Sequence, residues 1–88
     1  MKAWQLLDSP EKWTQYEWAR GSNGEKASET YPPVCWCIFG AVKDCYSGIS
    51  FKSPWVRLQN KLDNPVKWND APERTYEEVY AVLKELDI

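Results

Sequence analysis

Thirteen aromatic side chains in a chain of only 88 residues most constrain how this protein can fold. A domain of this size buries somewhat more than ~60% of the surface that its unfolded chain exposes, so its core is thin. Each aromatic side chain buries about 150–250 Å², so the six Trp, five Tyr and two Phe can fill such a core efficiently. We therefore expect one small domain, residues 1–88, packed largely by aromatic residues.

Three segments carry helix signals. Residues 75–86 start with a capping box and residues 53–64 start with a Ser-Pro pair, while residues 34–46 show apolar spacing with a wide buried face. Gly40 is disfavoured in a helix by ~1 kcal/mol relative to Ala, which predicts the close approach of another element there. The apolar positions are Val34, Cys35, Ile38, Phe39, Ala41, Val42, Cys45 and Tyr46; Trp55, Leu58 and Leu62; and Val79, Val82, Leu83 and Leu86.

The N-terminal part favours short elements. One or two helical turns are expected before Leu7 and a helix start at Ser9-Pro10. Residues 13–20 are rich in aromatics and are followed by Asn23-Gly24, which predicts a β-hairpin returning over residues 25–28. A helix from Pro10 to Ala19 is the alternative. With a turn-rich segment at residues 66–74, the sequence predicts an α+β fold, mainly α, with three main helices and a small hairpin near the N-terminus.

Charge and hydropathy exclude several partners. Eleven basic and 13 acidic residues give a net charge of −2, so no basic field is available to bind duplex nucleic acid. No segment approaches the ~18 apolar residues of a membrane span. The start of the chain, Met1–Asp8, is interrupted by charge too early for a signal peptide. We expect a protein of the cytoplasm, of a bacterial or a host cell, with no membrane partner.

The cysteines and the absence of histidine bear on chemistry. Cys35, Cys37 and Cys45 are an odd number within eleven residues, which predicts free thiols and not a disulfide framework. On the predicted helix Cys35 and Cys37 would lie about 200° apart, so they cannot share an ion. Without His or a second Cys pair, no metal site and no cofactor is expected. A chain with no His also lacks the commonest general base.

Several short motifs are specific in combination: Trp13-Thr14-Gln15, Ala19-Arg20 with Gly24 downstream, Cys35-Trp36-Cys37-Ile38-Phe39-Gly40-Ala41, Trp68-Asn69-Asp70, Arg74-Thr75 and Glu78-Val79. This set resembles the signature of a family of small bacterial and phage proteins catalogued as domain of unknown function 6197. The resemblance covers the chain from about Trp13 to Leu86. It implies a shared fold, and no activity comes with it.

One candidate site precedes the last helix. Trp68, Asn69, Asp70 and Arg74 stand together just before Thr75, where a helix N-terminus and a guanidinium can hold an anion. The alternative is structural, and the residue types favour it. Asn69 and Asp70 then form turns, Thr75 caps the helix, Arg74 pairs with an acid and Trp68 fills the core.

A second candidate site is aromatic. Strand alternation would place Tyr16 and Trp18 on one face and Trp13 on the other, while the predicted helix turns Trp36 towards another surface. With Arg20 nearby, such a face would suit a planar ligand such as a nucleobase, or a protein interface. The alternative, in which these aromatics pair across strands or cover the helices, is the commoner case.

The preferred function is a non-enzymatic binding protein. We expect it to capture a small anionic or nucleotide-like ligand, as an anti-defence sponge does, or a host protein that it inhibits; the resemblance to phage proteins suggests this by analogy. Surplus aromatics in a thin core also predict a homo-oligomer. The alternative is a small hydrolase or transferase that uses Asp70 with Glu73 or Glu77 as acid and base.

Overall fold

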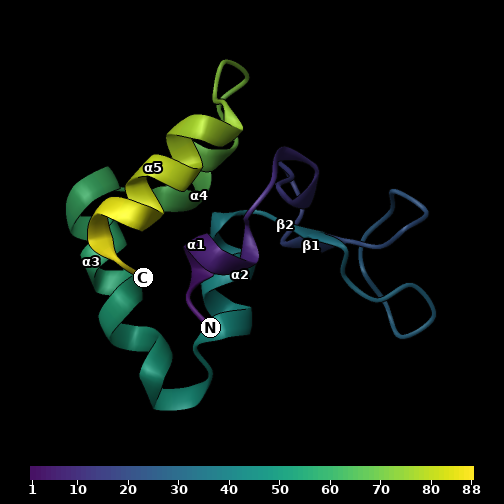
Figure 1. Cartoon of the computed structure of the whole chain (residues 1–88), viewed down its shortest axis with the longest axis horizontal. Coiled ribbons are helices and arrows are strands. Elements are labelled where there is room, and N and C mark those ends of the chain that lie inside the picture. The colour runs from purple at the N-terminus through teal and green to yellow at the C-terminus, as the bar shows by residue number, and fades with distance from the viewer.

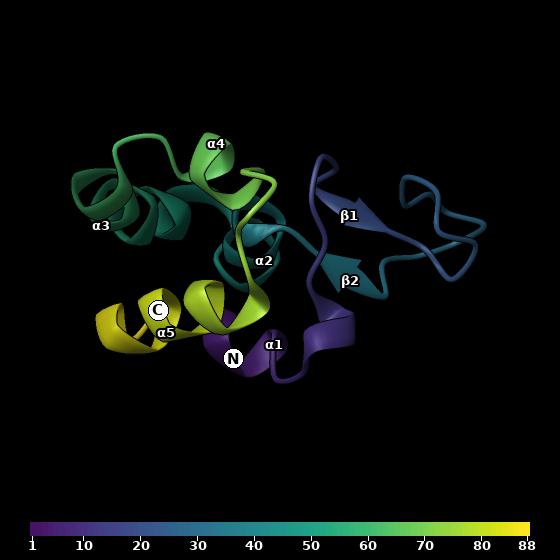
Figure 2. The same cartoon turned by 90° about the horizontal axis from the view of Figure 1, so that it is seen from above.

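Helices dominate the architecture, and three of them have eight or more residues (Figures 1 and 2). The computed structural model describes residues 1–88. The predominance of helices, with two short strands, confirms the predicted α+β, mainly α, fold. In chain order the elements are α1 (Ala3–Leu6), η1 (Pro10–Lys12), β1 (Ala19–Arg20), β2 (Cys35–Trp36), α2 (Ile38–Cys45), η2 (Gly48–Phe51), α3 (Lys52–Leu62), α4 (Pro65–Asn69) and α5 (Tyr76–Leu86), where η denotes a 3₁₀ helix.

One apolar core lies between the helices, with α2 in contact with both α1 and α4. Helix α5 starts as the capping box predicts, because Thr75 Oγ1 accepts from the Glu78 amide and Glu78 Oε1 accepts from the Thr75 amide. The two ends of the chain are joined by a hydrogen bond in which the Ala3 amide donates to the Ile88 carbonyl. No helix combines the length and the apolar character needed to cross a membrane. The buried core residues are Ala3, Leu7, Ile38, Ala41, Val42, Leu58, Val79, Leu83 and Ile88.

The small sheet joins different segments from those expected. Strand β1 pairs antiparallel with β2, with Ala19 opposite Trp36 and Arg20 opposite Cys35. The expected return over residues 25–28 makes only one isolated bridge, from Lys26 to Arg20. Residues 21–34 instead project from the body in both views (Figures 1 and 2). The alternative helix from Pro10 to Ala19 is also wrong, since helical structure there ends at Lys12.

The central helix is shorter than predicted. Helix α2 begins at Ile38, and the preceding residues, from Val34 on, include strand β2. Tertiary hydrogen bonds explain the difference, because the Cys37 amide donates to Trp18 O at 3.0 Å and the Ile38 amide donates to the Asn69 side chain at 3.0 Å. Cys37 is thus the N-cap of α2 and shares no helix with Cys35, and all three cysteines are free.

Gly40 in α2 allows the backbone of Trp18 to approach the helix closely. A Cβ added at Gly40 would lie 1.9 Å from Trp18 O, so the prediction of close backbone approach is confirmed.

The segment 66–74, expected to be irregular, begins inside helix α4. There Asn64 Oδ1 accepts from the Lys67 amide at 3.1 Å, and Pro65 occupies the first helical turn. Helix α4 and the Trp18 backbone thus both lie against the N-terminal half of α2.

Candidate functional site

Asn69 is the centre of a buried hydrogen-bond network. Its side chain is fully buried. Oδ1 accepts from Trp13 Nε1 at 2.8 Å and from the Ile38 amide at 3.0 Å. Nδ2 donates to Thr14 O at 3.2 Å and to Asp70 Oδ1 at 2.9 Å. These four bonds use the full capacity of a side-chain amide, so Asn69 has nothing left to offer a ligand.

Gln15 and Arg20 extend what we call the Asn69 network. Gln15 Nε2 donates to two carbonyls at the C-terminal end of α4, those of Asn69 at 2.9 Å and Ala71 at 2.8 Å. The Arg20 guanidinium donates to Thr14 Oγ1 at 3.0 Å, to Gln15 O at 3.1 Å and to Gly24 O at 3.0 Å. The structure therefore uses Arg20 to fix the backbone of residues 14–24.

Arg74 and Trp68 form a second internal unit. The Arg74 guanidinium lies 4.0 Å from the centre of the Trp68 ring, and its Nε donates to Trp68 O at 2.9 Å. Its NH1 pairs with Glu78 at 3.0 Å, and the Arg74 side chain is only 15% exposed. The hydrogen bond from the Thr75 amide, with a further contribution from Arg74, lowers the pKa of Glu78. This geometry matches the structural alternative for Trp68, Arg74 and Thr75. The expected turn roles of Asn69 and Asp70 are wrong, because both side chains bond to residues 13–16.

The Trp36 side chain is bonded within the chain and does not line the cavity described below. It is half-buried against the core, and its Nε1 donates to Asp44 Oδ2 at 2.9 Å. Trp13 forms an isolated parallel bridge with Trp36. The expected alternation of Tyr16 and Trp18 against Trp13 is wrong, because residues 15–18 bend and do not form a strand.

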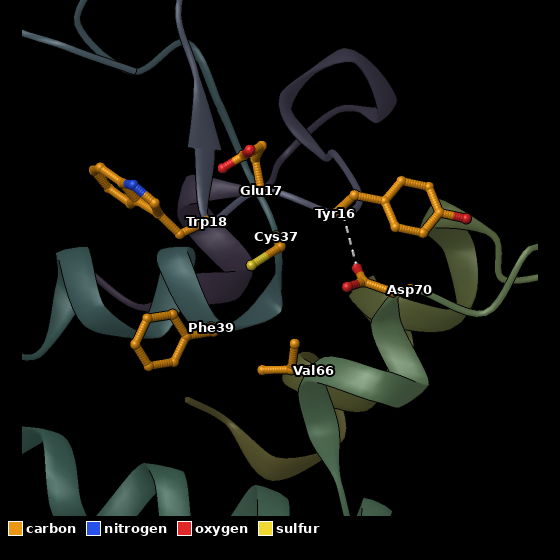
Figure 3. A pocket seen from close by; sticks show the side chains of 7 residues that line it. All are labelled: Tyr16, Glu17, Trp18, Cys37, Phe39, Val66 and Asp70. Atoms are coloured by element: carbon orange, nitrogen blue, oxygen red, sulfur yellow. Dashed lines mark hydrogen bonds between the residues drawn. The ribbon is translucent and has the colours of Figure 1, made fainter. Parts of the chain in front are cut away.

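A small cavity brings together three of the predicted site residues, Tyr16, Trp18 and Asp70 (Figure 3). Its volume is about 130 Å³, close to the ~150 Å³ of a protein cavity that holds one benzene ring. Ligand sites of ~300–1,000 Å³ are usual for larger molecules. We call this cavity the Tyr16 pocket; its lining is Tyr16, Glu17, Trp18, Cys37, Phe39, Val66 and Asp70.

The backbone of Tyr16 is strained. Its φ is +73°, in the left-handed region that non-glycine residues rarely adopt. The Tyr16 amide donates to Asp70 Oδ1 at 2.9 Å, which holds this conformation, and the side chain is 63% exposed. Such strain persists only where the surroundings enforce it, and it concentrates at functional sites. The combination marks the mouth of the pocket as a candidate surface.

The pocket is acidic and aromatic. Glu17 and Asp70 are half-buried, and no Lys or Arg lines the cavity. Cys37 Sγ accepts from the Gly40 amide at 3.4 Å, and burial raises the pKa of its thiol. Cys37 therefore carries no charge near neutral pH and is a poor nucleophile.

The carboxylates proposed for acid–base chemistry do not converge. Asp70 accepts from the Tyr16 amide and lines the pocket, whereas Glu73 and Glu77 are exposed and do not line it. No group of three or more His, Cys, Asp or Glu side chains is placed to hold a metal ion.

Sequence reasoning missed four lining residues, Glu17, Cys37, Phe39 and Val66. Phe39 is predicted on the buried face of the central helix, Cys37 elsewhere on that helix, and Val66 in a turn-rich segment. Only their placement opposite Tyr16 and Trp18 gives them a role, and no local signal reports that placement. Asn64-Pro65 could have predicted α4, which carries Val66.

Together the fold and the site define a small α+β protein with one compact, acidic and aromatic pocket. The chain belongs to a family of unknown function, DUF6197, whose model matches residues 1–86. The match confirms the resemblance drawn from the short motifs. No curated protein and no solved structure matches the chain.

Proposed function

We propose that this chain is a non-enzymatic binding protein that acts by stoichiometric capture through the Tyr16 pocket. The observation that carries the proposal is the pocket mouth, where Tyr16 is 63% and Val66 40% exposed beside a cavity of about 130 Å³. Exposed apolar side chains around a preformed cavity are typical of binding surfaces.

Of the two expected ligand classes, the geometry favours a partner protein over a nucleotide. A phosphate needs cationic or N–H donors, but Arg20 and Arg74 are occupied by bonds within the chain. The cavity has room for about one ring or one side chain. Tyr16 at its mouth is a residue type enriched at protein interfaces. We therefore propose that one anchoring side chain of a partner enters the pocket.

The partner proposed first is a cytoplasmic host protein, and a second copy of this chain is tested beside it. Large apolar residues are also exposed away from the pocket, among them Tyr31 and Val34 on the projecting loop. These residues support the earlier expectation of self-association. Sedimentation velocity over a range of concentrations measures it directly.

A matched pair of variants tests the pocket. Val66 and Val56 are both 40% exposed on helices, but only Val66 lines the cavity. We expect Val66→Trp to block the mouth and Val56→Trp to leave it open. Neither change touches the buried core, so both variants are expected to fold.

The readout is amide chemical shifts in labelled protein, titrated with single-ring and alkyl fragments and with a nucleotide panel. Binding that shifts Tyr16, Trp18 and Phe39 in wild type and in Val56→Trp, but at least about tenfold more weakly in Val66→Trp, supports the proposal. A nucleotide that instead shifts Trp68 and is lost in a folded Arg74→Ala variant contradicts it. So does a panel in which nothing perturbs the pocket.

A further inference from the structure

We propose that the Tyr16 pocket recognises the alkylammonium end of a lysine side chain on the partner protein. This inference rests on the proposed function and adds the chemistry of the anchoring group. The charge of the cavity supports it, since Glu17 and Asp70 line the cavity and no basic residue of the chain does. Two half-buried carboxylates without a cation are complementary to a positively charged guest.

Asp70 is held ready for such a guest. Its Oδ1 accepts from the Tyr16 amide and from Asn69 Nδ2, both at 2.9 Å. Its Oδ2 has no hydrogen bond within the chain and faces the space between Cys37 and Val66 (Figure 3). Because Asn69 is itself fully fixed, the free oxygen is preorganised and its position costs little entropy on binding.

The walls suit an alkyl stem that ends in a cation. Phe39 and Val66 offer apolar surface to the cavity, and the rings of Trp18 and Tyr16 point away from each other on its two sides (Figure 3). Lysine buries its methylene stem against apolar surface while its ammonium contacts carboxylates or ring faces. The cavity volume of about 130 Å³ fits one such stem and excludes a folded nucleotide.

The geometry favours lysine over arginine. A guanidinium presents a planar fork that is best matched by both oxygens of one carboxylate. Asp70 has only one free oxygen, because the Tyr16 and Asn69 bonds occupy the other. An ammonium is a compact charge that needs only the one free oxygen of Asp70, while Glu17 adds negative charge to the lining.

The probes are n-butylammonium, n-butanol as its neutral counterpart, n-butylguanidinium, and N-acetyl-lysine N-methylamide, each titrated while amide shifts are recorded. We expect the two ammonium compounds to shift Tyr16, Trp18 and Phe39, with affinity falling as salt rises. The capped lysine should bind at least as tightly as n-butylammonium, because its backbone contacts the apolar rim.

Three isosteric variants provide the controls. Asp70→Asn keeps the Oδ1 acceptor for Tyr16, so it should fold, and it should weaken ammonium binding about fivefold or more. Glu17→Gln should weaken it about twofold, and Glu73→Gln, an exposed acid outside the pocket, should leave it unchanged. Unchanged melting curves confirm that these variants are folded.

Each outcome has one meaning. Equal binding of n-butanol and n-butylammonium, or no effect of a folded Asp70→Asn variant, overturns the lysine inference but leaves the pocket as a binding site. Tighter binding of n-butylguanidinium overturns the choice of lysine. If n-butylammonium binds and the capped lysine does not, the guest is a free amine and the protein source is wrong. If Val66→Trp affects no ligand at all, the proposed function itself fails.

Discussion

Asn69 and Asp70 are neighbours in sequence, yet they belong to two regions with opposite properties. Asn69 is fully buried with all four of its side-chain hydrogen bonds made. Asp70 is half-buried, with one oxygen bonded and the other free at the Tyr16 pocket. The same three segments, residues 13–18, 37–39 and 66–70, build both regions. The Asn69 network has no unused hydrogen-bonding capacity, whereas the Tyr16 pocket presents a free carboxylate oxygen.

This comparison shows that residue type alone does not identify a binding site. Arg20, Arg74, Trp36 and Asn69 are all types that bind ligands, but here each is held by partners within the chain. Val66 and Phe39 are unremarkable types, and they line the cavity. The useful criterion is which polar and apolar groups remain unpartnered after folding.

The largest effect should come from breaking the Asn69 network. In Asn69→Ala the Ile38 amide and the Trp13 indole lose their acceptor. Since each unsatisfied buried donor costs about 1–3 kcal/mol, we expect the free energy of unfolding to fall by about 4 kcal/mol. Urea denaturation measures the change. Asn64→Ala, which removes one exposed cap, should cost about 1 kcal/mol. Equal costs at the two positions would show that the network is not central.

A second large effect is expected where α2 meets the residue 18 backbone. Gly40→Ala places a methyl group against Trp18 O, so α2 and the residue 18 backbone must separate. Even after the gain in helix propensity, the cost should be about 2 kcal/mol. Gly48→Ala meets open space and should cost only the strain of its positive φ, about 1 kcal/mol. A stabilised Gly40→Ala variant, judged from thermal unfolding, would contradict the tight contact.

In contrast to the two substitutions above, a substitution of Tyr16 at the pocket is expected to keep or raise the stability. Tyr16→Gly removes the strain of a φ of +73°, so stability should be unchanged or should rise by up to about 1 kcal/mol. Fragment binding at the pocket should be lost. Tyr31→Gly, another exposed tyrosine with no positive φ, should destabilise by about 0.5–1 kcal/mol. Unfolding and titration of both variants separate the roles, and a Tyr16→Gly variant less stable than Tyr31→Gly would mean that Tyr16 is structural.

The smallest expected effect is on how the stability depends on pH, through the Glu78 carboxylate. The pKa of Glu78 is lowered in the folded protein, chiefly by the Thr75 amide, so its contribution is present above its usual pKa near 4.5. That contribution is lost as the pH falls through the lower, folded-state pKa. Glu78→Gln should therefore flatten the decline in stability of the wild type below about pH 4.5. Melting curves between pH 3 and pH 6, about the range of carboxylate titration, test this, and identical pH profiles for the variant and the wild type would contradict it.

Local signals predicted the helices well where they acted alone. The capping box at Thr75 and Glu78 and the stripe that includes Leu83 need no distant partner, and α5 forms as expected. The start of α2 was misplaced by four residues, because apolar spacing at Val34 and Cys35 suits a helix as well as a strand. Tertiary acceptors on Trp18 and Asn69 decide between them.

The candidate site was only partly predictable for the same reason. Tyr16, Trp18 and Asp70 were selected by residue type and do meet at the pocket. Nothing local indicates that Asn69 is saturated or that Arg20 bonds backbone carbonyls, because their partners lie up to 56 residues away or depend on an irregular loop. Sequence named the residues, and packing decided which remain available.

Amide hydrogen exchange tests the central distinction most directly. The Ile38 amide, which donates to buried Asn69, should exchange only through global unfolding. The Tyr16 amide, which donates to Asp70 at an exposed position, should exchange through local opening, and ligand in the pocket should slow it. The account predicts a clearly higher opening free energy at Ile38 than at Tyr16. Equal opening free energies, or a Tyr16 amide whose exchange rate does not change with ligand, would contradict the distinction between the fully bonded Asn69 network and the available Tyr16 pocket.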